Sequence, residues 1–596
     1  YVAMQSVAKK LDVLTAEQFR SVINDYYPTM KDQYDFGAST DWFEEVTRKN
    51  PISQYYNVAF SGGAKSLGYR ASLSYQNDQG LLDKTSNNKL RAKMSINQRN
   101  FDDRLSIDYN LTYSKGKSEL ADNSILQQVA RRNPTEPVYD QEGITPISGG
   151  YYYNPGPFQY FNPVAMVNES TREKEMRDVM GSMKASFEII EGLKASVMGS
   201  ITPKDFGTNG SAEIKKSSST NSLLEASVDY RKAFKDHTIQ AIAGYSYNKG
   251  EYEENWSRNY LYDTDYFSYH NIGAGAALTQ GKAGMSSYKD ENKLIAFFGR
   301  VMYNYQERYL LSASVRYEGS SRFGANNKWG TFPAISAGWR INKEHFMEDI
   351  KWINDLKLRV GYGVTGNQEI GNYKSLQLLE KDRFFYYKEN WISTYKPASN
   401  PNPDLKWERK GELNIGLDFS VLEGRLGGTV DYYNRTTKDL LYWYTVPVPP
   451  NLYNQLFTNV GTIKNSGIEV TINAIPVQTK DFRWNSMLTL SHNTNKLDKF
   501  SNKDYAMVQI RTGYIPEDFQ QYTQSIVEGG PIGNFWGPRF LGVDENGQNI
   551  LEDLNKDGVI NEEDYQVIGN AYPDVTFGFS NTFTYKNWEL SFLLRG

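Results

Sequence analysis

Residues 105–113 read Leu105-Ser106-Ile107-Asp108-Tyr109-Asn110-Leu111-Thr112-Tyr113, with an apolar side chain at every odd position and a polar one between. A period of two is typical of a β-strand that has one apolar and one polar face. The same pattern returns in residues 356–364, 413–421 and 575–579. Such segments run about 9–14 residues, longer than most globular strands and long enough to cross a bilayer at a tilt.

The predicted strands are joined by connections that alternate between short and long. Short turns are predicted near 62–66, 100–104, 190–192, 234–237, 306–308, 422–425, 479–482 and 586–587, with a connection of middling length at 343–355. Long connections are predicted at 77–87, 116–174, 202–220, 251–292, 321–329, 367–409, 439–461 and 497–573. In an up-and-down sheet this puts short periplasmic turns at one end and long extracellular loops at the other. That arrangement is typical of an all-β, transmembrane antiparallel β-barrel.

The predicted barrel contains about 19 strands, the first at residues 1–5 and the last at 588–596. An open sheet edge would leave unpaired backbone groups in lipid at a cost of several kcal/mol each. We therefore expect residues 1–596 to be one incomplete barrel domain, preceded by further chain and followed by the last strands. Thr15 and Gln18 form a predicted capping box, which indicates a helix in the first long loop.

Composition excludes several classes of protein. The 596 residues carry 66 Lys and Arg against 70 Asp and Glu, so no basic excess points to nucleic acid. There is no cysteine, which excludes disulfides, thiolate metal sites and a cysteine nucleophile. The sequence has four scattered histidines, and we find neither a G-x-S-x-G elbow nor an H-E-x-x-H motif. We expect no enzymatic activity.

Residues 553–564 match the twelve-residue calcium-binding loop. The predicted ligands are Asp553, Asn555, Asp557, the Val559 carbonyl and Asp564, at loop positions 1, 3, 5, 7 and 12. An aspartate closes the loop where glutamate usually provides bidentate ligation, so we expect weaker binding. The sequence therefore predicts a structural Ca²⁺ site that braces the 497–573 loop, with Mg²⁺ as the other candidate cation. The alternative is a solvated acidic turn.

Aromatic side chains gather in two of the long loops. Tyr152 and Phe158 lie in the 116–174 loop, and Tyr386 and Trp391 lie in the 367–409 loop. Aromatic faces can stack on sugar rings or hold peptide side chains, so these four residues are predicted to bind substrate. The alternative is that they pack the loops together or belong to the aromatic girdle of a barrel.

Several longer segments carry a family resemblance, in order along almost the whole chain. They are residues 61–63, 317–324, 328–334, 336–340, 361–367, 402–408, 431–434, 439–441, 459–461, 465–469, 531–533 and 573–574. Together they resemble the SusC/RagA family of TonB-dependent outer-membrane transporters of Bacteroidetes. The resemblance implies a Gram-negative outer membrane, a 22-stranded barrel, and an N-terminal plug domain that we expect before residue 1.

The same resemblance implies a function and partners. These are active import of a large nutrient, an oligosaccharide or a peptide, driven by the TonB complex, with a SusD-like surface lipoprotein as a lid. A dimer of transporter–lid pairs is also expected. Three alternatives stay open: a peptide rather than a glycan importer, a passive porin or surface adhesin, and a barrel-borne enzyme.

Overall fold

The structure is a computed structural model and describes residues 13–122, 124–140, 150–153, 161–210, 213–264, 266–501, 509–515 and 521–596. The chain forms two compact units. Unit 1 contains Tyr1–Phe187, Val197–Leu224 and Lys249–Glu291, and unit 2 contains Glu188–Ser196, Glu225–Asn248 and Asn292–Gly596.

Eighteen long strands of the described residues form one antiparallel sheet. They are β1 (Ser53–Ala64), β2 (Leu67–Gln79), β3 (Ser86–Asn100), β4 (Leu105–Glu119), β5 (Arg172–Ile190), β6 (Leu193–Gly210), β7 (Glu213–Phe234), β8 (His237–Arg258), β9 (Gly284–Tyr305), β10 (Tyr309–Ser320), β11 (Trp329–Arg340), β12 (Ile353–Asn367), β15 (Glu408–Val421), β16 (Leu426–Lys438), β19 (Thr462–Gln478), β20 (Phe482–Lys499), β27 (Val575–Tyr585) and β28 (Trp588–Arg595). The predicted all-β antiparallel architecture is confirmed. The predicted strand at residues 1–5 lies outside the described residues.

Short strands decorate the long connections. The loop after β12 contains the hairpin β13 (Leu379–Tyr387) and β14 (Asn390–Pro397), and the loop after β16 contains β17 (Leu441–Thr445) and β18 (Gln455–Asn459). The loop after β20 contains β21 (Gln509–Ile515), β22 (Gln521–Val527), β23 (Asn534–Gly537), β24 (Phe540–Val543), β25 (Asn549–Leu551) and β26 (Gln566–Asn570). Short turns and longer loops alternate along most of the chain as predicted. The predicted long connection at 202–220 is wrong, because β6 extends to Gly210 and β7 begins at Glu213. The polar residues of this segment continue the two strands, since backbone pairing does not require an apolar face.

Helices of the described residues are also confined to connections. They are α2 (Ala16–Tyr26), α3 (Lys31–Tyr34), α4 (Trp42–Val46), α5 (Ile125–Arg131) and α6 (Pro163–Glu169), with 3-10 turns at Pro28–Met30, Ser268–Ala274, Ile341–Lys343, His345–Met347 and Glu562–Asp564. Thr15 caps α2 as predicted, because its hydroxyl accepts from the Gln18 backbone N–H at 3.3 Å while its own N–H donates to Gln18 Oε1 at 2.9 Å.

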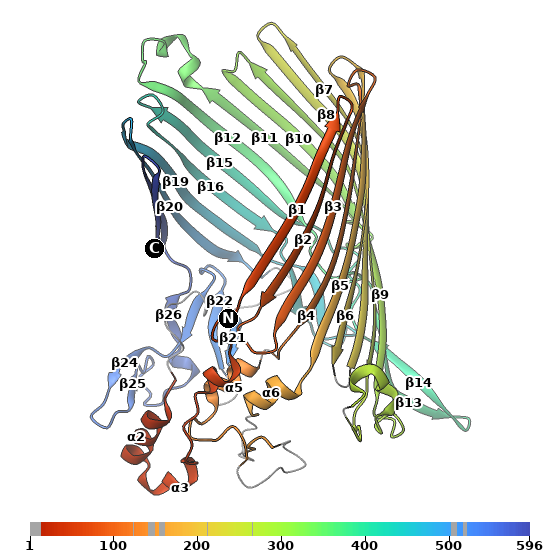
Figure 1. Cartoon of the computed structure of the whole chain (residues 1–596), viewed down its shortest axis with the longest axis vertical. Helices are drawn as coiled ribbons and strands as arrows, with labels where there is room; N and C mark the ends of the chain where they lie inside the picture. The colour runs from red at the N-terminus through yellow and green to blue at the C-terminus, as the bar shows by residue number, and fades with distance from the viewer. Residues whose placement is uncertain are drawn as a thin grey trace. The chain divides into compact units, whose positions relative to one another are not determined.

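In unit 1 the strands β1 to β5 pair in sequence order. The register places Leu73 of β2 opposite Val58 of β1 and Ala92 of β3. These strands lie side by side, and α2, α5 and α6 lie at the end that carries the long connections (Figure 1).

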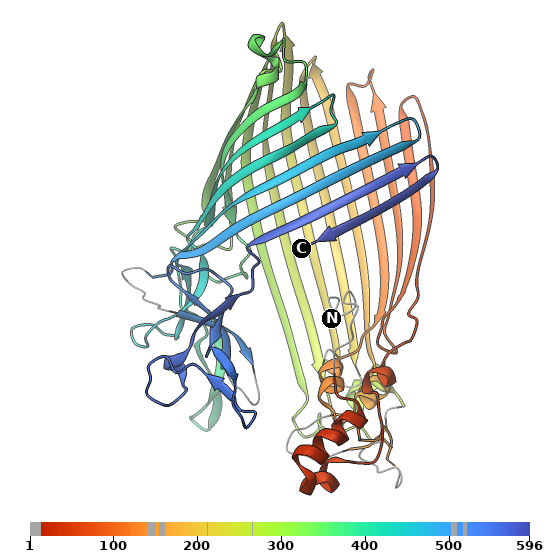
Figure 2. The same ribbon diagram turned by 90° about the vertical axis from the view of Figure 1, so that its left-hand side faces the viewer.

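In unit 2 the strands from β9 to β12, and then β15, β16, β19, β20, β27 and β28, also pair in order along the chain. The small strands of the 500–574 connection lie at the long-loop end of β20 and β27 (Figure 2). Because consecutive strands pair antiparallel and short turns alternate with long loops, the long loops lie at a single end of this unit.

The buried apolar clusters of the described residues lie among these connections. One in unit 1 includes Trp42, Val46, Ile125, Val129 and Val164. Two others in unit 2 are built around Leu405 and Trp407, and around Val460, Leu497 and Phe500. The long loops are therefore folded structures with cores of their own.

Candidate substrate-binding surface

The two faces of the long strands differ in chemistry, as the period of two requires. On β12 the side chains of Leu358, Val360 and Tyr362 are exposed on one face, and Tyr362 is 49% exposed. Lys357 and Arg359 alternate with them on the opposite face. Exposed apolar side chains in such a continuous row are suited to hydrocarbon, whereas the polar face is suited to a water-filled interior.

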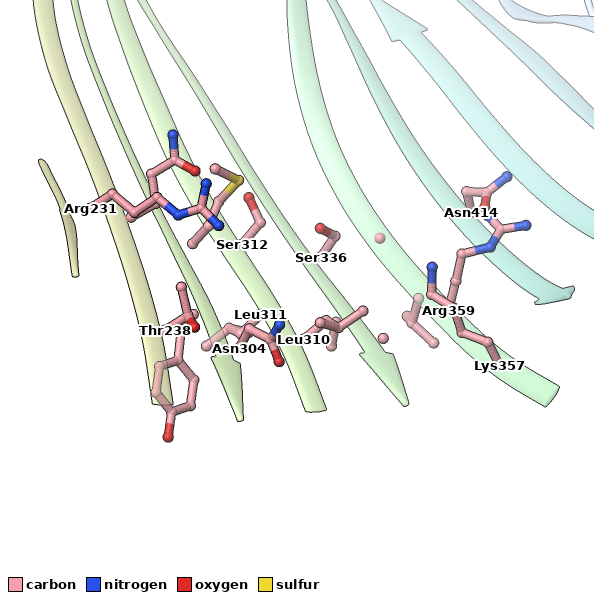
Figure 3. A pocket seen from close by; sticks show the side chains of 17 residues that line it. Arg231, Thr238, Asn304, Leu310, Leu311, Ser312, Ser336, Lys357, Arg359 and Asn414 are labelled. Atoms are coloured by element: carbon pink, nitrogen blue, oxygen red, sulfur yellow. The ribbon is translucent and has the colours of Figure 1, made fainter. Parts of the chain in front are cut away.

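The polar face of unit 2 contains a pocket of about 580 Å³ near the short turns. Its floor consists of small side chains, including Ser312, Ser336 and Gly361. Figure 3 shows Arg231 on one side of this floor and Lys357 with Arg359 on the other. The pocket therefore offers hydroxyl groups and the Arg231 guanidinium to the interior, whereas Lys357 and Arg359 are paired with carboxylates.

Arg359 is held in place by two carboxylates from the neighbouring strands. Its Nε donates to Asp418 Oδ2 at 2.9 Å, and its Nη2 donates to Asp418 Oδ1 at 2.7 Å and Asp431 Oδ1 at 3.1 Å. Gly416 lies opposite Arg359 in the register, and a Cβ there would lie 2.6 Å from Arg359 Nη2. The lack of a side chain at Gly416 therefore lets the guanidinium cross β15 to reach Asp431 on β16.

This network of Arg359, Asp418 and Asp431 was not predicted from the sequence. The period of two already placed Lys357 and Arg359 opposite the apolar set of β12. The pairing of Arg359 with Asp418 and Asp431 depends on the register between β12, β15 and β16, which strand periodicity alone does not give.

Three long loops of unit 2 meet in one buried cluster, which we call the loop core: Phe323, Phe332, Leu405, Trp407 and Phe457. Trp407 Nε1 donates to the Lys328 carbonyl at 2.9 Å. Gly324 lies so close to the Pro403 carbonyl that a Cβ would collide with it. Many residues that carried the family resemblance therefore serve to hold the loops together.

Side-chain amides join the same loops. Asn400 Nδ2 donates to the carbonyls of Tyr453 at 2.6 Å and Gln455 at 2.9 Å, and Asn402 Nδ2 donates to the Phe457 carbonyl at 2.9 Å. These bonds connect the loop that contains the β13–β14 hairpin to the loop that contains β17 and β18. The base of the hairpin is thereby fixed.

Tyr386 and Trp391, two of the predicted substrate residues, lie directly opposite each other on this hairpin. Their ring centroids are 5.1 Å apart, and the two residues are 55% and 69% exposed. The structure therefore brings this pair together and leaves its aromatic surface accessible on a fixed support.

Tyr152, in unit 1, has a different setting. It is half-buried, its ring lies 5.9 Å from that of Phe36, and its carbonyl accepts from Arg132 Nη2 at 3.2 Å. These contacts fit the alternative in which the residue packs the loops. Phe158, the fourth predicted residue, lies outside the described residues.

The predicted metal ligands lie in one exposed turn, except for Asp564, which is fully buried. Asp553 accepts from the backbone N–H groups of Lys556 at 2.6 Å and Gly558 at 2.8 Å, and Gly558 has φ of +83°. Asp557 accepts from the Val559 N–H at 2.8 Å. The carboxylates thus face the loop's own amides, as Asx-type turns do.

Asp564 accepts from two backbone groups at 2.8 Å each, the N–H of Asn561 and that of Leu554. These donors, above all Asn561, hold the pKa of Asp564 below its usual value, although burial acts in the opposite direction. Among the described residues, no group of three or more His, Cys, Asp or Glu side chains is arranged to hold a metal ion. A bound cation would therefore need some of these loop contacts to rearrange.

The described part of the chain contains no helix that is both long and apolar enough to cross a membrane.

A sheet with one apolar and one polar face, short turns at one end and folded long loops at the other defines an outer-membrane β-barrel domain. Residues 190–592 match the family described as TonB dependent receptor-like, beta-barrel. The chain belongs to the TonB-dependent receptor family, whose members are receptors and transporters rather than enzymes.

Relatives agree with this assignment. TonB-dependent receptor SusC of Bacteroides thetaiotaomicron is 30% identical over 100% of this chain and 62% of its own length. TonB-dependent receptor P3 of Formosa agariphila is 28% identical over 99% of this chain and 61% of its own. The solved structure of the RagAB peptide transporter superposes with a TM-score of 0.79 at 20% identity, over 97% of this chain and 66% of that one. The resemblance to SusC/RagA and the outer-membrane location are confirmed.

Proposed function

We propose that this chain is the barrel part of a TonB-dependent importer that takes up a large nutrient across the outer membrane. Family membership supports this proposal, and the exposed Tyr386–Trp391 pair on its fixed hairpin is the observation that carries it. The chain spans about 62% of the length of SusC, and import by the whole protein is what we propose. Substrate meets the long-loop end and passes along the polar interior.

Uptake by the full-length protein in its own host tests this function. We expect accumulation of the nutrient that depends on TonB and stops when a protonophore collapses the inner-membrane gradient. The double substitution Tyr386→Ala and Trp391→Ala should reduce uptake at low nutrient concentration by about thirtyfold, since two aromatic stacks of about 1 kcal/mol each are lost. Trp352→Ala, which removes an exposed aromatic at the short-connection end, serves as the matched control. Uptake that persists without TonB would favour the passive porin.

The proposed partner is a SusD-like surface lipoprotein that covers the long-loop end. The resemblance to the SusC/RagA family, which implies such a lid, supports this arrangement. Affinity purification of the full-length protein from outer membranes in mild detergent, followed by mass spectrometry, should recover one lipoprotein in stoichiometric amount. Recovery of the barrel alone would contradict the lid. Mass photometry of the same sample tests the proposed dimer of transporter–lid pairs.

For the substrate we propose an oligosaccharide, with a peptide as the alternative. Aromatic faces such as that of Trp391 stack on sugar rings, which supports the glycan. Competition for uptake between oligosaccharide and peptide mixtures distinguishes the two.

We further propose that the 553–564 loop binds Ca²⁺ as a structural ion. Its oxygen-bearing side chains at loop positions 1, 3 and 5 and Gly558 in the left-handed conformation support this. Added Ca²⁺ should protect the loop from proteolysis, and Asp553→Asn with Asp557→Asn should abolish the protection. Asp544→Asn with Glu545→Gln in the neighbouring turn is the matched control. Equal protection by Mg²⁺ would assign that ion instead.

A further inference from the structure

Five of the basic residues on the polar face of β2, β3 and β5 in unit 1 lie within one stretch of these strands, from the position of Lys89 to that of Asn97 on β3. We call them the basic track: Arg70, Lys89, Arg91, Lys93 and Lys184. The register places Arg70 opposite Ser95, Lys93 opposite Ser72, and Arg91 opposite Ser74. Because paired residues of adjacent strands share a face, these side chains point to the side opposite Leu73 and Met94.

The track is not neutralised by ion pairs. Among the described residues, none of its five members has a carboxylate oxygen within 4 Å of its charged nitrogen, whereas Lys117 and Lys215, also in unit 1, pair with Glu173 and Glu254 at 2.9 Å. The same face carries three acids near the track: Asp78, Asp108 and Asp178. Asp108 lies opposite Lys184 and accepts from Asn97 Nδ2, Asp78 lies opposite Asn87, and Asp178 lies opposite Ser114. The face therefore retains an excess of positive charge.

The basic track runs along the strands instead of gathering at one point. Lys89, Arg91 and Lys93 are two residues apart on β3, so neighbouring charges are about 7 Å apart along the strand. Lys89 lies near the long-loop end, while Arg70 and Lys184 lie in the rows nearest the short turns. Lys184 lies in register with Asn97 of β3, through Asp108 of β4, and Asn97 is eight residues from Lys89. At about 3.3 Å per residue the track is therefore about 26 Å long.

Neutral hydrogen-bonding groups fill the spaces between the charges. Ser72, Ser74, Ser95, Asn110, Thr112 and Ser114 occupy the adjacent positions of the same rows. Hydroxyl and amide groups can donate to and accept from hydroxyls, whereas Lys and Arg only donate and prefer carboxylate. An extended ligand that carries both hydroxyls and regularly spaced carboxylates matches this surface better than a neutral sugar does.

We propose that the basic track is a binding surface for an acidic oligosaccharide, one with uronic-acid carboxylates, along its path through the barrel. The proposal rests on the proposed import function and narrows its substrate class. The track spans about half the length of β3, which suits an extended ligand that moves along the strands. A polar wall lined with cations attracts anions and raises their local concentration.

Equilibrium binding to the purified full-length protein tests this without requiring import. The probes are fluorescent hexagalacturonate and the neutral maltohexaose, at low salt and at 0.5 M NaCl. We expect tighter binding of hexagalacturonate, weakened by salt, and a loss of about tenfold in the double substitution Arg91→Gln and Lys93→Gln. Lys31→Gln with Lys65→Gln removes the same charge from connecting segments and should change the affinity less than twofold.

Several outcomes would overturn the proposal. They are no measurable hexagalacturonate binding by the wild type, no preference over maltohexaose, or an unchanged affinity in Arg91→Gln/Lys93→Gln. A hexaglutamate peptide that binds more tightly than hexagalacturonate would assign the track to acidic peptides. If the double substitution instead lowers thermal stability and leaves binding intact, the track holds an acidic protein segment. The import function is tested separately by TonB-dependent uptake, so failure of the binding proposal can be distinguished from failure of the import proposal.

Discussion

Arg132 and Glu136 form an ion pair that is almost completely buried among the loops of unit 1. Arg132 Nε lies 2.8 Å from Glu136 Oε2, and its guanidinium lies 5.2 Å from the Trp42 ring. Burial lowers the pKa of Arg132, since desolvation disfavours its charge. Arg132→Ala should therefore leave Glu136 uncompensated and destabilise this loop assembly by about 3–5 kcal/mol. This loss of stability should appear as faster amide exchange in residues 34–46 and 125–136. The neighbouring Arg131→Ala is the control and should leave exchange in these residues unchanged.

Asp564 should make the stability of the 553–564 loop depend on pH. Its pKa is depressed in the folded loop, so the stabilisation it gives is present above its unfolded pKa of about 3.9 and is lost as pH falls through the folded value. The amides of Leu554 and Asn561 should lose exchange protection only below about pH 4, after correction for intrinsic rates. Asp564→Asn should remove that dependence and weaken protection at pH 7. Protection that is independent of pH in the wild type would refute this account.

The loop core is the element that gives the long loops of unit 2 their shape. Leu405 is fully buried between Phe323 and Trp407, so Leu405→Ala should cost about 2–5 kcal/mol of loop stability. We expect faster proteolysis within residues 368–407 while the strand sheet remains intact. Leu376→Ala, at a residue that is 51% exposed, should leave the cleavage rate unchanged. Equal rates for the two variants would mean that the core does not limit loop opening.

The sequence alone predicted the long strands well and the loops poorly, for a physical reason. Strands such as β4 and β12 can be identified by their period of two, because each must present one apolar face to lipid. The bonds that Asn400 makes to the carbonyls of Tyr453 and Gln455 join segments more than 50 residues apart, which no local pattern encodes. Tyr386 and Trp391 were identified as aromatic, but their pairing required the hairpin register. Arg322, in the predicted 321–329 connection, donates from Nε to Asn372 Oδ1 at 2.9 Å, a contact between two loops that the sequence did not indicate.

For the whole molecule, the separation of long loops from short turns predicts how the chain faces the cell exterior. Residues 1–596 contain no cysteine, so single cysteines can be introduced into this part of the protein and compared with the unsubstituted protein. In intact cells a membrane-impermeant maleimide should label Lys388→Cys, in the β13–β14 turn, and should not label Lys235→Cys, in the β7–β8 turn. Both sites should react after the outer membrane is permeabilised. Labelling of Lys235→Cys alone in intact cells would show that the short turns, and not the long loops, face the cell exterior.

The anchored base of the β13–β14 hairpin has an evolutionary consequence. Its supports, Asn400, Asn402 and the loop core, lie outside the hairpin itself, so the residues between 379 and 397 are free to vary without loss of the scaffold. Under the proposed function, substitutions confined to this one short exposed segment would change which nutrient is bound. The same division suggests a grafting site, where a foreign hairpin could be transplanted to redirect what the cell captures.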